Sequence, residues 1–283
     1  ACGTSGSPRP HRKLAAGGAC ADESGHGAQT EKPMSVWTVL LLSLLPGAGN
    51  FAGGMLAEFG TVTGRIVNRA LHAAAGIVIA IVAVELMPEA LKSLSGWWVA
   101  AAFGAGGVAY VLVEMAIERW QSGGEGDRTR MWMIYVAVAV DLTADGLMLG
   151  SGAAVSSSMA IVLAAGQVLA DVPEGYASVA NFRDKGLSRG RRILLSASFM
   201  LFCVGAALLS YLLLRDAGEG PKMAALSFVA GLLTVAAVED MIEEAHEAEA
   251  DTRQSILAFV GGFVLFTLVS VGLETVVAQG PAG

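Results

Sequence analysis

The sequence has little charge and no surplus of basic residues. Only 15% of its 283 residues are charged, whereas 54% are hydrophobic, and the mean hydropathy is +0.59. These proportions argue against a soluble domain and are typical of membrane proteins with several spans. The net charge is −7, so we expect no nucleic acid partner.

Cysteines are few and follow no spacing typical of a disulfide framework or a metal site. Cys2 and Cys20 lie in a polar N-terminal segment and Cys203 lies in an apolar one, so we expect unpaired thiols. Residues 1–33 contain no apolar run long enough for a signal-peptide core, and we expect a disordered tail before a transmembrane domain over 34–283. Met34 is an alternative start of the chain.

Eight apolar stretches are long enough for a helix of about 20 residues to cross a bilayer. They are residues 35–58, 71–92, 96–117, 131–151, 157–180, 192–214, 223–243 and 254–278. The sequence therefore predicts an all-α membrane protein with eight transmembrane helices and with both termini on one side.

Basic residues are distributed unequally between the two sides. Because Lys and Arg favour the cytoplasmic side, their excess after the first, third, fifth and seventh stretches predicts that both termini face outside. These residues are Arg65, Arg69, Arg119, Arg128, Arg130, Arg183, Lys185, Arg189, Arg191, Arg192 and Arg253, against Lys92, Arg215 and Lys222 in the opposite loops. Four basic residues of the tail weakly favour the opposite orientation: Arg9, Arg12, Lys13 and Lys32.

Four carboxylates interrupt the fourth and fifth stretches, and neither stretch contains a Lys or Arg to pair with them. Asp141 and Asp145 share one helical face, as do Asp171 and Glu174. At roughly 2.5–3.5 kcal/mol each, four such groups oppose insertion by about 10–14 kcal/mol. A cation from outside would balance them, which predicts a metal or proton path. Capping of a neighbouring helix is the alternative for the first pair.

Pro173 stands between Asp171 and Glu174. Because proline donates no backbone hydrogen bond, we expect a kink that frees the carbonyl of Leu169 as a further oxygen ligand, with an ordinary packing kink as the alternative. Gln167, one turn before Asp171, offers an amide oxygen to the same site or a hydrogen bond between helices.

A weak internal repeat links the second and seventh stretches. Residues 75–90 align without gaps on residues 230–245, and the alignment superposes Glu85 on Asp240. The two stretches run in opposite senses, as expected of an inverted-repeat transporter. Chance similarity among alanines, glycines and acids is the alternative.

Three acids in the repeat are candidates for a further metal site. We expect Glu85 and Asp240 to form a site at the outer mouth of the metal path. The alternative is that Glu85 lies at the membrane–water interface without a role in metal binding. Glu239 and Asp240 point about 100° apart, so only one faces the path squarely, and we favour Asp240. A solvated helix end is the alternative for this acidic run.

Two motifs resemble those of the ZIP family of divalent-metal transporters. The pattern Asp171-Val172-Pro173-Glu174-Gly175 resembles the family's fifth-helix motif, and Asp141-x-x-x-Asp145-Gly146 resembles a variant of its fourth-helix motif. Eight spans with both termini outside also fit, so the resemblance covers roughly residues 35–278. It implies a metal path lined by Asp141, Asp145, Asp171 and Glu174.

The resemblance also implies the cargo and the location. A divalent ion such as Zn²⁺, Mn²⁺ or Fe²⁺ would be the transported substrate, and no prosthetic group is expected. Similarity to prokaryotic members implies the bacterial inner (plasma) membrane, with lipid as the surrounding partner. Whether the protein forms a homodimer is left open.

The chain departs from the family pattern in its ligands. It has Asp141-Leu142 where typical members have His-Asn, and Ala170 where they have Gln or His. The sixth stretch has no carboxylate, and Phe202 or Cys203 stands near the position of a glutamate found in some members. Without imidazoles, oxygen ligands favour Mn²⁺, Fe²⁺ or Mg²⁺ beside Zn²⁺.

Two other functions are open alternatives. Because family ligands are missing, the chain fits a non-transporting metal sensor or a structural relative with a degenerate site. A membrane enzyme such as a lipid head-group transferase would resemble Asp-x-x-Asp-Gly followed by Ala-Arg, but three residues separate Asp141 from Asp145 and no Arg follows. We therefore expect a transporter and not an enzyme.

Overall fold

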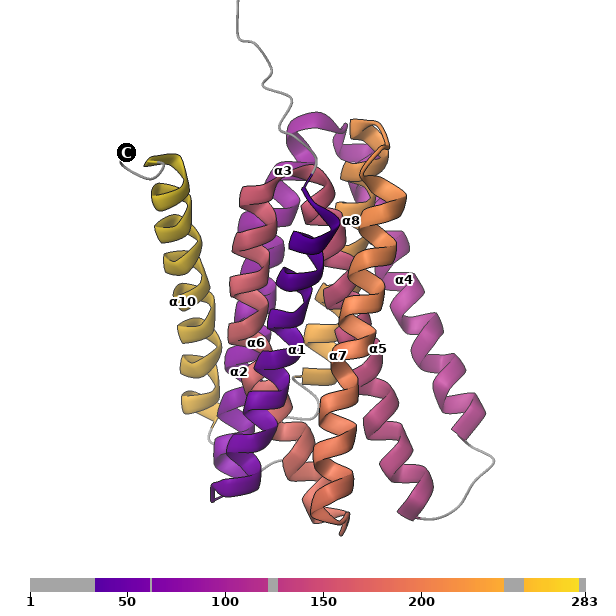
Figure 1. Cartoon of the computed structure of the whole chain (residues 1–283), viewed down its shortest axis with the longest axis vertical. Helices are drawn as coiled ribbons and strands as arrows, with labels where there is room; N and C mark the ends of the chain where they lie inside the picture. Colours follow the sequence, from indigo (N-terminus) through magenta and orange to yellow (C-terminus); the bar gives the residue numbers. More distant parts are fainter. Residues whose placement is uncertain (1–33, 62, 122–126, 242–251, 280–283) are drawn as a thin grey trace, which may run out of the picture. The chain divides into compact units, whose positions relative to one another are not determined.

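The computed structural model describes residues 34–61, 63–121, 127–241 and 252–279. All of them belong to one unit of the chain, Pro33–Gly283. Every regular element within the described ranges is helical, which confirms the predicted all-α class. Long helices run lengthwise beside one another (Figure 1). The tail expected over 1–33 lies outside the described residues.

The helices follow the predicted apolar stretches and extend several of them. They are α1 (Val36–Phe59), α2 (Gly64–Ala80), η1 (Ile81–Leu86), α3 (Met87–Ser93), α4 (Gly96–Gln121), α5 (Asp127–Val155), α6 (Ser157–Asp184), α7 (Arg189–Leu214), α8 (Glu219–Ala236), η2 (Ala237–Met241) and α10 (Thr252–Gln279). The elements η1 and η2 are π-helical, and each directly continues an α-helix.

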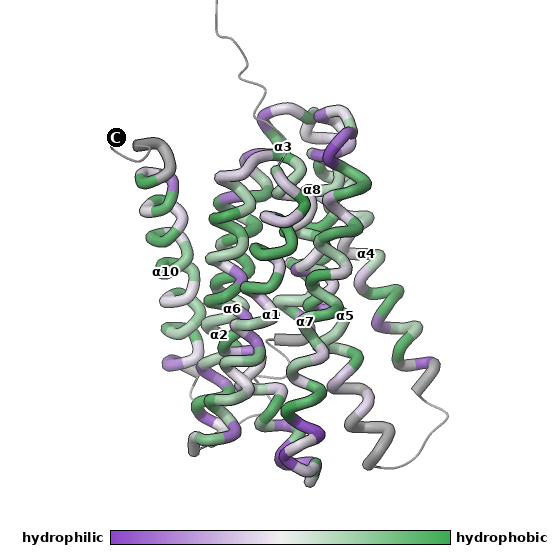
Figure 2. The backbone as a smooth tube through the Cα atoms, in the orientation of Figure 1, coloured by the Kyte–Doolittle hydropathy of each residue, from purple (hydrophilic) through white to green (hydrophobic). Residues whose placement is uncertain are grey.

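Seven helical segments within the described residues are long and apolar enough to cross a membrane, which is the pattern of an integral membrane protein. They are Val36–Phe59, Gly64–Ser93, Gly96–Ile117, Tyr135–Val155, Arg189–Leu214, Glu219–Glu239 and Arg253–Val276. The remaining predicted stretch, 157–180, is helical as part of α6 but less apolar. Figure 2 shows apolar residues along much of each helix and many polar residues toward the helix ends.

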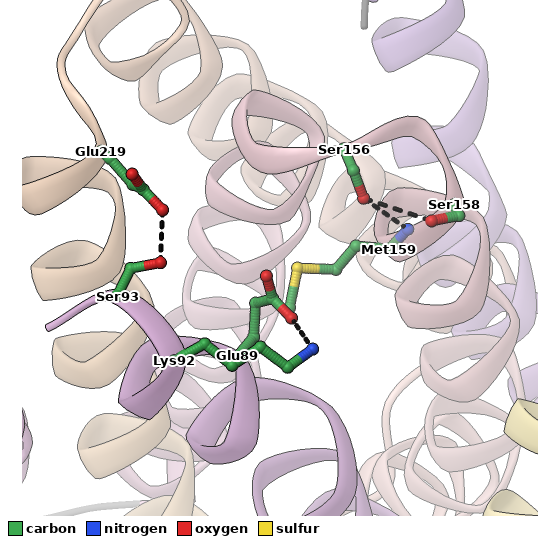
Figure 3. Close-up of polar contacts among 7 residues, drawn as sticks. All are labelled: Glu89, Lys92, Ser93, Ser156, Ser158, Met159 and Glu219. Atoms are coloured by element: carbon green, nitrogen blue, oxygen red, sulfur yellow. Dashed lines mark hydrogen bonds and ion pairs between the residues drawn. The ribbon is translucent and has the colours of Figure 1, made fainter. Parts of the chain in front are cut away.

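Hydroxyl side chains cap the first turns of α1, α2 and α6 within the described residues. Ser35 accepts a hydrogen bond from the Trp37 amide at 3.2 Å at the start of α1. Ser156 accepts one from the Met159 amide at 3.1 Å at the start of α6 (Figure 3). Such caps satisfy amides that the first helical turn leaves without a partner. Ser156 also separates α5 from α6, so that the chain can turn back on itself.

The helices form two groups. In the first group, α1 packs on α6 and α7, and α5 packs on α7 and α6. In the second group, α2 packs on α10, and α4 packs on α8. The groups meet mainly where α2 contacts α6 and where α5 contacts α8. The four predicted acids of α5 and α6 therefore all lie in the first group.

Glycines allow α1 and α6 to approach closely. A Cβ atom at Gly175 would collide with the backbone of Asn50, and a Cβ atom at Gly53 would collide with the backbone of Val172. In lipid the hydrophobic effect does not bring helices together, so membrane helices depend on close van der Waals packing, which small residues allow. The contacts fix the register of α1 along α6.

Reciprocal glycine contacts also join the helix pairs of the second group. In each pair, both helices contribute one glycine, and that glycine packs against the backbone of the partner helix. The contacts are Gly76 with Phe259 and Gly262 with Ala73 between α2 and α10, and Gly231 with Phe103 and Gly106 with Phe228 between α8 and α4. Both pairs therefore cross at points where a larger residue has no room.

Polar contacts connect elements near the helix ends. Glu58 at the end of α1 accepts two hydrogen bonds from Arg192 of α7, at 2.8 Å from Nε and 2.7 Å from Nη2. Such bidentate pairs fix geometry as well as adding energy. Ser93 at the end of α3 donates to Glu219 at the start of α8 (Figure 3).

Candidate metal centre

Three carboxylates from two helices converge inside the first helix group. Asp141 and Asp145 of α5 and Glu174 of α6 each offer one oxygen, and these oxygens lie within 4.8 Å of one another. The residues are only 6%, 1% and 6% exposed, respectively. Oxygen ligands lie about 2.0–2.6 Å from a divalent cation, so oxygens this close fit around a single ion.

Asp171, the fourth predicted acid, lies against Asp145 and is 1% exposed. Asp171 lies next to Asp145 and Glu174 lies next to Asp141, so α5 and α6 run antiparallel here. Two carboxyl groups this close either share a proton, so that only one is ionised, or are both ionised around a bound cation. The site thus consists of two adjacent acid pairs, one helical turn apart.

No basic side chain among the described residues forms an ion pair with these four acids. Ion pairs elsewhere in the described part of the chain include those of Lys92 with Glu89, of Arg189 and Arg192 with Glu58, and of Arg215 with Asp216. Within the same residues, one oxygen each of Asp145, Asp171 and Glu174 has no hydrogen-bond partner. Each such buried atom costs about 1–3 kcal/mol, and more where it is charged. The arrangement is chemically suited to bind a cation.

The other unsatisfied side-chain atoms buried in the described residues belong to Asn50, Gln167 and Ser196. These residues lie on α1, α6 and α7, the same helix group as the acids. Gln167 has an unpartnered Oε1, in keeping with its predicted role as an amide ligand, which stays a prediction. Sequence reasoning missed Asn50 and Ser196. Asn50 could have been found as an amide inside an apolar stretch, one turn after Pro46.

Pro173 does not interrupt α6. The helix is continuous from Ser157 to Asp184 with the proline inside it. Because proline has no amide hydrogen, the Leu169 carbonyl receives no hydrogen bond from residue 173. The role of this carbonyl as a ligand stays a prediction.

Cys203 of α7 lies beside the acids. Gly146, which follows Asp145, packs against the Cys203 backbone, and the cysteine is completely buried and unpaired. Phe202 is 38% exposed. Phe202 and Cys203 both stand near the position where some ZIP members have a glutamate. Of these two, Cys203 lies in the interior.

Glu85 and Glu239 do not belong to the group of three converging acids among the described residues. Glu85 in η1 is partly exposed and accepts a hydrogen bond from Ser270 of α10, a partner that the sequence did not indicate. Glu239 in η2 is also partly exposed. The side chain of Asp240 lies outside what is described, so its pairing with Glu85 stays a prediction.

Comparison of the chain with protein-family models and with curated proteins found no significant match. What the site can bind therefore follows from its geometry and from the chemistry of its residues. The likeness of two motifs to the ZIP family stays a prediction.

Proposed function

We propose that this protein carries a divalent metal cation across a membrane, along a path between α5 and α6. The observation that carries the proposal is the convergence of Asp141, Asp145 and Glu174, buried and without a basic partner among the described residues. An ionisable residue inside a membrane helix marks an ion pathway by default. The motif resemblance to ZIP transporters supports the same function.

The donor atoms favour a hard cation. The four acids and Gln167 supply carboxylate and amide oxygens, which suit Mg²⁺ and Mn²⁺ better than they suit soft ions. In this proposal the cargo is Mn²⁺ or Fe²⁺ in preference to Zn²⁺. Cys203 packs against Gly146, the residue after Asp145, and offers a softer donor near the acids.

In the same proposal α6 is an eighth span. It packs against α1, α2, α5 and α10, so protein covers much of its polar surface and it needs less apolar character than a helix facing lipid. Eight spans put both termini on one side, and the bias of basic residues assigns that side to the outside of a bacterial inner membrane.

We also infer an inverted repeat in the second helix group. In the alignment of 75–90 with 230–245, Gly76 corresponds to Gly231, and each glycine packs against the backbone of its partner helix. The stretch that forms η1 corresponds to the stretch that contains η2. Equivalent halves of opposite topology would support alternating access to the acids.

A competition experiment in proteoliposomes tests the proposed transport. We expect uptake of Mn²⁺ or Fe²⁺ above that of protein-free vesicles, measured against Zn²⁺, Cd²⁺ and Mg²⁺ as competitors. Dominant Zn²⁺ selectivity would contradict the assignment of oxygen ligands. Calorimetric metal binding without flux would instead support the non-transporting sensor.

A further inference from the structure

Asn50 is a buried amide whose hydrogen-bonding groups are both unsatisfied. It lies in the middle of α1 and is 0% exposed. Neither Oδ1 nor Nδ2 has a hydrogen-bond partner within the part of the chain that the structure describes. Folded proteins satisfy most buried polar groups, so such an exception points to water or an ion.

The contacts of neighbouring glycines show where the Asn50 side chain points. Gly53 of α1 faces α6, where a Cβ atom would meet Val172, while Gly47 faces α7, where a Cβ atom would lie 2.7 Å from Met200 Cγ. Residues three apart in a helix lie on one face, so Asn50 projects between the directions of Gly47 and Gly53. Asn50 is therefore directed at the seam between α6 and α7.

Asn50 also lies at the level of the acid pairs. Its backbone packs against Gly175, the residue that follows Glu174. A Cβ atom at the preceding residue, Gly49, would lie 3.6 Å from Cβ of Asp171. Both contacts are with residues of the α6 acid motif. The amide of α1 and the carboxylates of α6 thus occupy the same depth in the first helix group.

We propose that Asn50 is a metal ligand of this site, supplied by a third helix, an inference that rests on the proposed function. Its Oδ1 adds a neutral oxygen donor to the carboxylates of α5 and α6, and hard divalent ions accept amide oxygens readily. A neutral donor raises the coordination number without adding another buried negative charge. A bound ion would also give the Asn50 amide the partner that it lacks among the described residues.

The test is calorimetric titration of the full chain in detergent with Mn²⁺, together with thermal unfolding of the metal-free protein. We expect Asn50→Leu to weaken Mn²⁺ binding by at least about tenfold, since even outer-shell partners of metal ligands contribute 10–100-fold. Asn50→Asp, which keeps an oxygen at this position, is expected to retain binding. Asn50→Leu is also expected to raise the unfolding temperature without metal, because it removes an unsatisfied amide.

Ser43→Ala is the matched control on the same face of α1. Ser43 is 0% exposed, but its hydroxyl donates to the Leu40 carbonyl at 2.9 Å, and we expect its loss to leave Mn²⁺ affinity unchanged. Wild-type affinity in Asn50→Leu would overturn the assignment of Asn50 and leave the proposed function intact. A lower unfolding temperature of metal-free Asn50→Leu would also overturn it, in favour of a structural role. Absence of Mn²⁺ binding by the wild type would remove the proposed function itself.

Discussion

The double variant Asp141→Asn, Glu174→Gln is expected to lose metal binding and to become more stable without metal. It preserves the shapes of two facing side chains but removes two carboxylates that no basic residue balances within the described residues. We expect metal affinity to fall by at least about 100-fold, since weakening a single outer partner already costs 10–100-fold. Metal-free stability should rise by about 1 kcal/mol or more, because uncompensated buried charge opposes folding. Thermal unfolding with and without Mn²⁺ measures both effects.

Thr143→Val on the same helix is the control for this variant. The Thr143 hydroxyl donates to the Ala139 carbonyl at 2.7 Å within α5, so we expect wild-type metal stabilisation after its removal. If Mn²⁺ raises the unfolding temperature of the double variant as much as that of the wild type, Asp141 and Glu174 do not hold the ion. A double variant less stable than the wild type without metal would show that the acid pair has a structural role.

Gly175→Ala is expected to destabilise the protein strongly. The added methyl group would enter the backbone of Asn50, and a backbone cannot move aside as a flexible side chain can. The helices α1 and α6 would have to separate, and we expect a loss of about 3 kcal/mol or more. Denaturation of the purified protein in detergent measures the loss.

Gly205→Ala provides the matched comparison. Gly205 lies inside α7, and a Cβ atom there would meet no atom within 4 Å. We expect unchanged stability or a gain of up to about 1 kcal/mol from the better helix propensity of alanine. Equal tolerance of both substitutions would contradict the close contact between α1 and α6.

The parts of the fold set by local composition could be predicted from the sequence. Apolar stretches of spanning length correspond to the helices, because insertion requires about 20 apolar residues in a helix. The convergence of Asp141 with Asp145 could also be predicted, since residues four apart share a face. Glu174 was expected on the same path, and in the structure the short break at Ser156 brings α6 back along α5.

Features that depend on contacts between distant helices could not be predicted. The direction of Asn50 depends on how α1 lies against α6 and α7, and no periodicity within α1 reveals that. Choosing Cys203 over Phe202 likewise required the position of α7 against Gly146. Ser270, the partner of Glu85, is supplied by α10, which is remote in sequence. Each of these results comes from packing between segments.

Metal uptake into proteoliposomes by the wild type, Asp171→Ala and Glu174→Ala tests the central claim most directly. These two residues belong to the two different acid pairs, so each substitution removes one carboxylate from the path. We expect wild-type uptake well above that of protein-free vesicles, and rates close to the protein-free level for both variants. Uptake by both variants at the wild-type rate would contradict a carboxylate-lined metal path between α5 and α6.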